Sequence, residues 1–269
     1  MPYRIVFTDI DGTLLNADRE LSKFTIQEIR RIKSEIPVVL ISSRMPSAMY
    51  HLQEQLAIID QPLICYNGGL IVHNNNIISS TTIPIEHVQQ IVEQSIDLQV
   101  HLSLYHKDEW YVPSNDFWAK REANNTKVTP VVQDLKYTVN KWNTENKGAH
   151  KIMCMGQEES VTKMYNYLKD NFEGDLHLYR SKPTYIEIAS KTISKQTAVQ
   201  HLLSTHYNID IKNAVAFGDN YNDIAMIKAV GIGVAVANAK EETLKAAKHV
   251  TLHAKQDGVA QFIKDHIIL

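Results

Sequence analysis

The feature that most limits the possible folds is a series of short apolar runs that end abruptly in polar residues. Residues 5–8, 38–41, 63–66 and 214–217 are rich in aliphatic and aromatic side chains and contain no charged residue. Such near-continuous apolar strands are typical of a parallel sheet covered on both faces. Segments with helical spacing alternate with them, as in residues 26–32, where isoleucine stands at every third position. The alternation predicts an α/β fold.

The middle third of the chain has a different pattern. From about residue 85 to residue 185 the strand-like runs are more polar, and aromatic residues such as Trp110 and Trp142 are frequent. This pattern is typical of a sheet with one open face. We therefore expect an α/β core domain of residues 1–84 and 186–269, interrupted by an α+β domain of residues 85–185. A length of 269 residues agrees with two domains.

The composition indicates a soluble globular protein, with 44% hydrophobic and 22% charged residues and a net charge of -2. Because the two signs of charge nearly balance, neither nucleic acid nor a membrane surface is expected as the main partner. Cys65 and Cys154 lie far apart and predict no disulfide framework. The N-terminus is too polar for a signal peptide, and no apolar run reaches the roughly 18 residues of a membrane helix. We expect a cytoplasmic protein.

Polar clusters follow three of the apolar runs: Asp9 and Asp11, Ser42 and Ser43, and Asp219 and Asp223. Ligands of open α/β sheets bind just outside the carboxyl ends of the strands, so these clusters converge on one crevice if the strands are neighbours. Four carboxylates in one crevice would repel one another unless a divalent cation neutralised them. Hard oxygen ligands without a histidine or cysteine cluster indicate Mg²⁺.

These residue types match the groups that phosphoryl transfer requires. A carboxylate nucleophile divides the reaction into two easier steps through an aspartyl phosphate, and Asp9 suits this role. Asp11 suits protonation of the leaving oxygen and later deprotonation of water, and Gly12 gives the backbone freedom to bring it around. Ser42 and Ser43 offer hydroxyl and backbone N–H groups to the phosphoryl oxygens.

Positive charge and further metal ligands come from later in the chain. Lys195 stands at the start of an expected helix, where its charge and the helix dipole would both favour a phosphoryl group. Asp219 follows the run at 214–217 and suits a metal ligand. Asn222 and Asp223 lie one turn further on.

Together these motifs resemble the haloacid dehalogenase-like superfamily, and within it the Cof-type phosphatases. The matching segments, in the family's order, are DIDGTLL at 9–15, NGG at 67–69, SK at 194–195, GDNYND at 218–223, VANA at 236–239 and DGV at 257–259. The resemblance implies a Rossmann-like three-layer sandwich core with an inserted α+β cap domain. It also implies a Mg²⁺-dependent phosphatase that acts on small phosphorylated metabolites through a phospho-aspartate.

The resemblance implies a role for each matching residue. Asp9 would be the nucleophile and a Mg²⁺ ligand, and Asp11 would be the acid/base and bind Mg²⁺ through its backbone carbonyl. Asp219 would complete the metal site, with Asp223 binding directly or through water. The phosphate-binding residues would be Ser42, Ser43, Lys195 and Asn222. Candidate substrate contacts are Arg44, Asn67 and Gly68.

One departure from the family pattern stands at the second motif. The family commonly has Thr-Gly-Arg there, whereas this chain has serine at 42 and 43 before Arg44. Ser43 lacks the backbone freedom of glycine, which would change how this loop approaches substrate. Arg44 could instead pair with a nearby carboxylate, and residues 67–69 could form an ordinary turn.

The sequence leaves the substrate and two rival functions open. Family analogy favours sugar phosphates, with pyridoxal phosphate or flavin mononucleotide as alternatives. A phosphomutase of the same superfamily would keep Asp9 and Asp11, and a non-catalytic phosphometabolite-binding protein would keep the fold. No pattern in the sequence indicates an oligomeric state.

Overall fold

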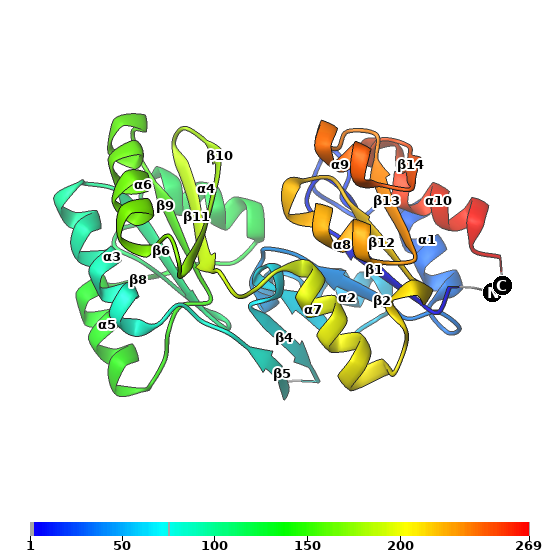
Figure 1. The fold of residues 1–269 in the computed structure, drawn as a ribbon, viewed down its shortest axis with the longest axis horizontal. Coiled ribbons are helices and arrows are strands. Elements are labelled where there is room, and N and C mark those ends of the chain that lie inside the picture. Colours follow the sequence, from blue (N-terminus) through cyan, green and yellow to red (C-terminus); the bar gives the residue numbers. More distant parts are fainter. Residues whose placement is uncertain (1–2, 75, 269) are drawn as a thin grey trace. The chain divides into compact units, whose positions relative to one another are not determined.

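A computed structural model describes residues 3–74 and 76–268. The chain divides into two compact units, Met1–Ile78 with Ser194–Leu269, and Ser79–Ile193 (Figure 1). The sequence predicts domain boundaries at 84/85 and 185/186, whereas the two units divide at 78/79 and 193/194. Residue Ile83 forms a β-bridge with Ala149, and strand β11 (Tyr185–Ser190) pairs with strands on both of its sides, so both segments lie within the second unit.

The first unit is built on a sheet with the strand order β14-β13-β12-β1-β2-β3-β4-β5. The strands are β1 (Ile5–Asp9), β2 (Val38–Ile41), β3 (Leu63–Cys65), β4 (Leu70–His73), β5 (Asn76–Ser80), β12 (Ala214–Gly218), β13 (Ile232–Val236) and β14 (His249–Thr251). The strands from β14 to β3 are parallel, and β4 turns back antiparallel to β3. Because β1 lies between β2 and β12, the three strands that the sequence singles out are direct neighbours.

Helices cover both faces of this sheet, which confirms the predicted Rossmann-like three-layer core. The helices of this unit are α1 (Lys23–Ile32), α2 (Tyr50–Leu56), α7 (Lys195–Leu202), α8 (Ile224–Ala229), α9 (Glu241–Ala246) and α10 (Gly258–His266). Ile5 and Phe7 of β1 pack with Val199 of α7 and Met226 of α8 in one buried cluster. On the opposite face, the ring of Phe217 in β12 lies 5.4 Å from that of Phe262 in α10.

The second unit is an α+β domain, as the sequence predicts. Its sheet has the order β10-β11-β9-β6-β7-β8, and only the β7–β8 pair is parallel among the described ladders. The further strands are β6 (His101–His106), β7 (Glu109–Val112), β8 (Val131–Val132), β9 (Lys151–Met155) and β10 (Leu176–Lys182). The helices are α3 (Ile85–Asp97), α4 (Phe117–Thr126), α5 (Leu135–Thr144) and α6 (Glu158–Phe172).

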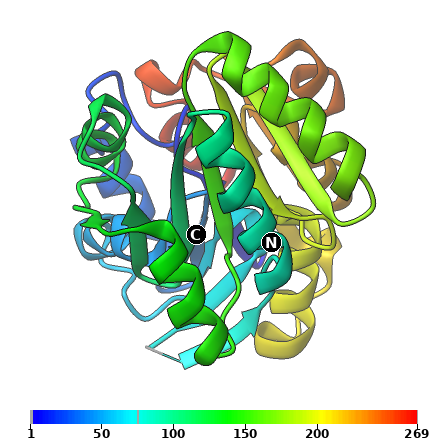
Figure 2. The same cartoon turned by 90° about the vertical axis from the view of Figure 1, so that its left-hand side faces the viewer.

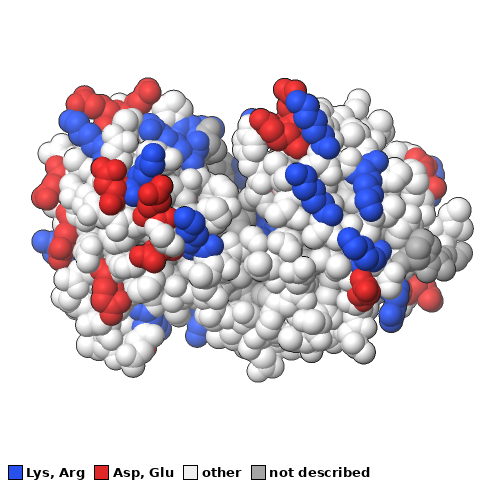
Figure 3. All heavy atoms as spheres, in the orientation of Figure 1, with Lys and Arg blue, Asp and Glu red and all other residues white. Residues whose placement is uncertain are grey.

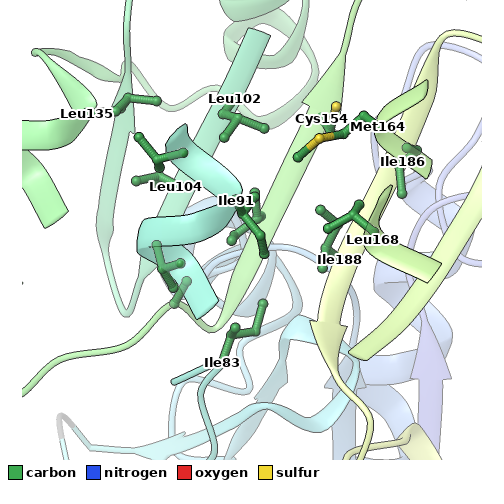
Figure 4. Packing of buried hydrophobic residues seen from close by; sticks show 14 of the residues in the cluster. Ile83, Ile91, Leu102, Leu104, Leu135, Cys154, Met164, Leu168, Ile186 and Ile188 are labelled. Atoms are coloured by element: carbon green, nitrogen blue, oxygen red, sulfur yellow. The ribbon is translucent and has the colours of Figure 1, made fainter. Parts of the chain in front are cut away.

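Three of these helices form a layer on one face of the second sheet, as Figure 2 shows for α3, α5 and α6. Side chains from the helices and the strands meet in a single apolar cluster (Figure 4). Ile91 of α3 and Leu168 of α6 point toward Leu104 of β6 and Ile188 of β11. Burial of this cluster supplies the main driving force for folding of the unit.

Figure 3 shows one face of the molecule, on which positively and negatively charged side chains are interspersed in each of the two units. None of the helices formed by the described residues is long and apolar enough to span a lipid bilayer.

Candidate active site

The carboxyl ends of β2, β1 and β12 bring three of the predicted clusters to one edge of the first sheet. Asp9 is the last residue of β1 and lies in register with Ile41 of β2, so that Ser42 follows directly beside it. Asp219 follows the end of β12 on the other side of β1. The strand order and register therefore bring the three polar clusters together at one edge of the sheet, as the sequence predicts.

Lys195 lies at the centre of this group. It is the first residue of α7, after Ser194, whose hydroxyl accepts a hydrogen bond from the backbone N–H of Thr197 at 3.1 Å. The Lys195 Nζ donates to Asp9 Oδ1 at 2.5 Å and to Asp223 Oδ1 at 2.6 Å. All three side chains are buried. The helix start, fixed by its cap, thus places a buried cation between two carboxylates.

Burial and mutual repulsion dominate the electrostatics of the carboxylates. Burial raises the pKa of Asp9 well above its usual range, and the neighbouring Asp223 and Asp219 raise it further, so that the attraction of Lys195 offsets only part of the shift. Burial and the charge of Asp223 likewise raise the pKa of Asp219 to about 6. Burial alone would lower the pKa of Lys195, but the adjacent carboxylates of Asp223 and Asp9 outweigh it and raise the pKa. The cluster therefore favours additional positive charge.

The same cluster has the geometry of a cation site. One oxygen from each of Asp9, Asp219 and Asp223 lies within 4.8 Å of the others. Asp9 Oδ2 is buried and has no hydrogen-bond partner, which is costly for a carboxylate oxygen unless a cation binds it. Carboxylate oxygens are the ligands that Mg²⁺ prefers. The residues present therefore fit a metal ion of this kind.

The loop after Asp9 approaches Asp219 closely. Gly12 has a φ of 89°, and a Cβ at this position would lie 2.5 Å from Asp219 Oδ2. The next residue, Thr13, donates its hydroxyl to Asp219 Oδ1 at 3.1 Å. Only glycine satisfies both the left-handed backbone and the space at this point.

Asp11 stands apart from the three-carboxylate cluster. Arg44 donates to both of its oxygens, Nε to Oδ2 at 2.7 Å and Nη2 to Oδ1 at 2.8 Å, and Arg19 donates to Oδ1 at 2.6 Å. Burial alone would raise the pKa of Asp11, but Arg44 and Arg19 outweigh it and lower the pKa. The pairing of Arg44 with a carboxylate, which the sequence leaves open, is the arrangement in this structure.

The remaining predicted residues line the same region of the first unit. Ser42 is buried, and its hydroxyl accepts a hydrogen bond from the backbone N–H of Arg44 at 3.2 Å, whereas Ser43 is half-buried. Asn222 Nδ2 donates to Asn67 Oδ1 at 3.0 Å. Gly68 lies against the start of α7, where a Cβ would lie 2.6 Å from the carbonyl oxygen of Ser194.

Three residues near the site have no role in the sequence-based prediction: Thr13, Arg19 and Asn238. Thr13 belongs to the DIDGT segment, but its hydrogen bond to Asp219 could not be predicted because the two residues lie far apart in the sequence. Asn238 lies in the VANA segment, where its Nδ2 donates to the carbonyl of Gly12 at 2.8 Å and its Oδ1 accepts from the N–H of Ala254 at 2.8 Å. No sequence pattern marks Arg19.

The chain matches the model of the haloacid dehalogenase-like hydrolase family over residues 6–263. The chain belongs to this family. A Bacillus subtilis relative, the 5-amino-6-(5-phospho-D-ribitylamino)uracil phosphatase YitU, is 30% identical over 279 residues that cover 100% of this chain and 98% of the relative. The Escherichia coli pyridoxal phosphate phosphatase YbhA is 25% identical over 276 residues, with 100% of both chains covered.

The solved structures agree with this assignment. A haloacid dehalogenase-like hydrolase from Bacteroides thetaiotaomicron superimposes with a TM-score of 0.88 at 27% identity, covering 97% of this chain and 98% of that one. The family membership that the sequence motifs suggest is thus confirmed. The protein is therefore an enzyme, a phosphatase of the haloacid dehalogenase-like family.

Proposed function

We propose that the protein is a Mg²⁺-dependent phosphatase that hydrolyses small phosphomonoesters through a phospho-aspartate on Asp9. The observation that carries this proposal is the environment of the Asp9 carboxylate. Lys195 binds one of its oxygens, and the other is buried without a hydrogen-bond partner next to Asp219 and Asp223. A buried carboxylate in such surroundings suits a group that must react rather than one that stabilises the fold.

The reaction divides into two displacements at phosphorus. In the first, an Asp9 oxygen forms a bond to phosphorus while the bond to the substrate's leaving oxygen breaks, and a proton from Asp11 goes to that oxygen. In the second, a water oxygen attacks phosphorus, Asp11 accepts a proton from this water, and the bond to Asp9 breaks to release inorganic phosphate. The pairing of Asp11 with Arg44 lowers its pKa and favours the carboxylate, which is the form that acts as base in the second step. The first step requires the protonated form, so we propose that Asp11 leaves Arg44 and takes up a proton before it donates to the leaving oxygen.

The site supplies positive charge and donors for the phosphoryl oxygens. Lys195, Ser42, Ser43 and Asn222 would bind these oxygens. Asp9, Asp219 and Asp223, together with the backbone carbonyl of Asp11, would hold Mg²⁺, which would neutralise charge on the transferring group.

The substrate is proposed to be a small phosphorylated metabolite. Relatives are named for pyridoxal phosphate and for a ribitylaminouracil phosphate, so heterocyclic phosphates stand beside sugar phosphates as candidates.

The test is release of inorganic phosphate from a panel of sugar phosphates, pyridoxal phosphate and flavin mononucleotide, with Mg²⁺ and with a chelator. We expect release that requires Mg²⁺ and favours a few members. Phosphoryl return to a sugar in the presence of a bisphosphate, with little free phosphate, would instead identify a phosphomutase. Tight binding of a phosphorylated compound by folded protein without any turnover would identify a non-catalytic binding protein.

A further inference from the structure

The turn between β3 and β4 has an unusual backbone. Tyr66, Asn67 and Gly68 adopt φ angles of 53°, 55° and 105° in succession. Positive φ is unfavourable for a bulky residue such as Tyr66, which is also fully buried, at 1% exposure. Residues in such conformations persist only where the surrounding structure holds them, and they concentrate at functional sites.

Two neighbouring segments of the active site hold this turn. The backbone N–H of Tyr66 donates to the carbonyl of Arg44 at 3.2 Å, and that of Asn67 donates to the carbonyl of Ser42 at 2.9 Å. On its other side, Gly68 packs against Ser194, directly before Lys195. The turn therefore contacts both the loop after β2 and the start of α7.

The side chain of Asn67 adds a third link. It is 5% exposed, and its Oδ1 accepts the hydrogen bond from Asn222 Nδ2 at 3.0 Å. Asn222 lies in a single helical turn, Tyr221–Asp223, and is only half-buried, so this bond restricts the orientation of its amide. Through its backbone Asn67 binds the Ser42 segment, and through its side chain it binds Asn222.

We infer that Asn67 is a positioning residue for phosphoryl transfer, which acts by holding the amide of Asn222 and the backbone at Ser42 in place. This inference rests on the proposed function, in which Ser42 and Asn222 bind the phosphoryl group. Small displacements of positioning groups lower rates strongly, because the bound geometry has to match the transition state. Asn67 therefore affects the rate of the reaction through its contacts with Asn222 and the Ser42 backbone.

A simpler explanation is that asparagine stands here because it tolerates a left-handed backbone. The variant Asn67→Gly separates the two explanations, since glycine adopts this backbone freely but has no side chain to bind Asn222. Asn208 is a matched control: it has a φ of 50°, is exposed, and ends the helical turn Leu203–Tyr207. The change Asn208→Gly is chemically the same but lies outside the site, so kcat should not change.

The decisive experiment is a double-mutant cycle with Asn67→Gly and Asn222→Ala, measured as kcat and KM with Mg²⁺ on the panel substrate that the wild type hydrolyses fastest. We expect Asn67→Gly to lower kcat about tenfold with an unchanged unfolding midpoint. The double variant should lose no more than Asn222→Ala alone, because both changes remove the same interaction. Losses that multiply, or wild-type kcat in either single variant, would overturn the inference.

A conservative variant provides a second test that does not depend on how Asn67→Gly folds. Asn67→Asp keeps an acceptor oxygen for Asn222 Nδ2 and tolerates the left-handed backbone, so in this background Asn222→Ala should lower kcat by the same factor as in the wild type. No effect of Asn222→Ala in this background would contradict the inference. Failure of the proposed function would appear differently, as wild-type protein that releases no phosphate with Mg²⁺.

Discussion

The ammonium group of Lys195 lies 2.5 Å from Asp9 Oδ1, and both side chains are buried. The pair joins the first residue of α7 to the last residue of β1, at the edge of the sheet where Ser42 and Asp219 also lie. Because Asp223 shares the same ammonium, two buried carboxylates depend on one cation. This dependence leads to predictions for stability as well as for catalysis.

Replacing Lys195 should destabilise the metal-free protein. Lys195→Met leaves Asp9 and Asp223 buried without their cation, and removal of one partner of a buried ion pair costs about 3–5 kcal/mol. We expect a correspondingly lower free energy of unfolding in urea with a chelator present. Added Mg²⁺ should stabilise the variant more than the wild type, because the ion supplies the missing charge.

The control for this measurement is Lys228→Met, which changes an exposed lysine in the same unit. Its free energy of unfolding should stay within about 0.5 kcal/mol of the wild type. Equal stability of Lys195→Met and Lys228→Met in the chelator would show that the buried pair contributes nothing.

Replacing Asp9 should abolish turnover without unfolding the protein. Asp9→Asn keeps the size of the side chain but removes the nucleophile, so kcat for phosphate release should fall by at least about 10⁴-fold. Circular dichroism and the unfolding midpoint establish that the variant is folded, and the exposed Asp18→Asn serves as control. Turnover within tenfold of the wild type would exclude Asp9 as the nucleophile.

Removing Asp219 should weaken Mg²⁺ binding. The affinity of oxygen sites for divalent cations depends on the number of charged ligands, so Asp219→Ala should raise the Mg²⁺ concentration for half-maximal activity at least about tenfold. The rise of the thermal unfolding midpoint with added Mg²⁺ should shrink in parallel, which gives a readout independent of activity. Glu242→Ala, at an exposed position, should leave both titrations unchanged. If Asp219→Ala also leaves them unchanged, Asp219 is no metal ligand.

The meeting of Asp9, Ser42 and Asp219 could be predicted because it depends on strands alone. Buried parallel strands are apolar throughout, so their ends are visible as abrupt changes to polar residues, and the ends of parallel strands share one edge of the sheet. Lys195 could be placed because serine at 194 marks a helix start. These signals are local in the sequence, so they can be interpreted without knowing how the side chains pack.

Contacts between side chains on different loops could not be predicted in this way. Asp11 and Arg44 follow different strands, and their pairing depends on side-chain conformations that no periodicity encodes. The same holds for Asn67 with Asn222. The sequence also gives no signal for the end of the second unit, because β11 is joined to α7 only by residues 191–194, and the pairing of β11 with β9 and β10 is visible only in the fold.

A pH-dependent loss of stability is expected from His150 in the second unit. Its Nε2 lies 3.0 Å from Ser80 Oγ, and its Nδ1 accepts a hydrogen bond from the backbone N–H of Lys107 at 3.2 Å. Burial, and to a lesser degree His106 and Lys107, lower the pKa of His150 to about 3. In the unfolded chain the imidazole has its ordinary pKa of about 6.5, so the unfolded state takes up a proton at a higher pH than the folded state. The contribution of His150 to stability is therefore fully present above about pH 6.5.

This contribution decreases as the pH falls from about 6.5 toward 3, by about 1.4 kcal/mol per pH unit. The measurement is urea unfolding between pH 7.5 and 4.5, followed by tryptophan fluorescence, because Trp110, Trp118 and Trp142 are the chain's three tryptophans and all lie in the second unit. His150→Gln cannot titrate, so its stability should depend less on pH than that of the wild type. The exposed His201→Gln should behave as the wild type. Parallel pH curves for wild type and His150→Gln would show that His150 does not carry this dependence.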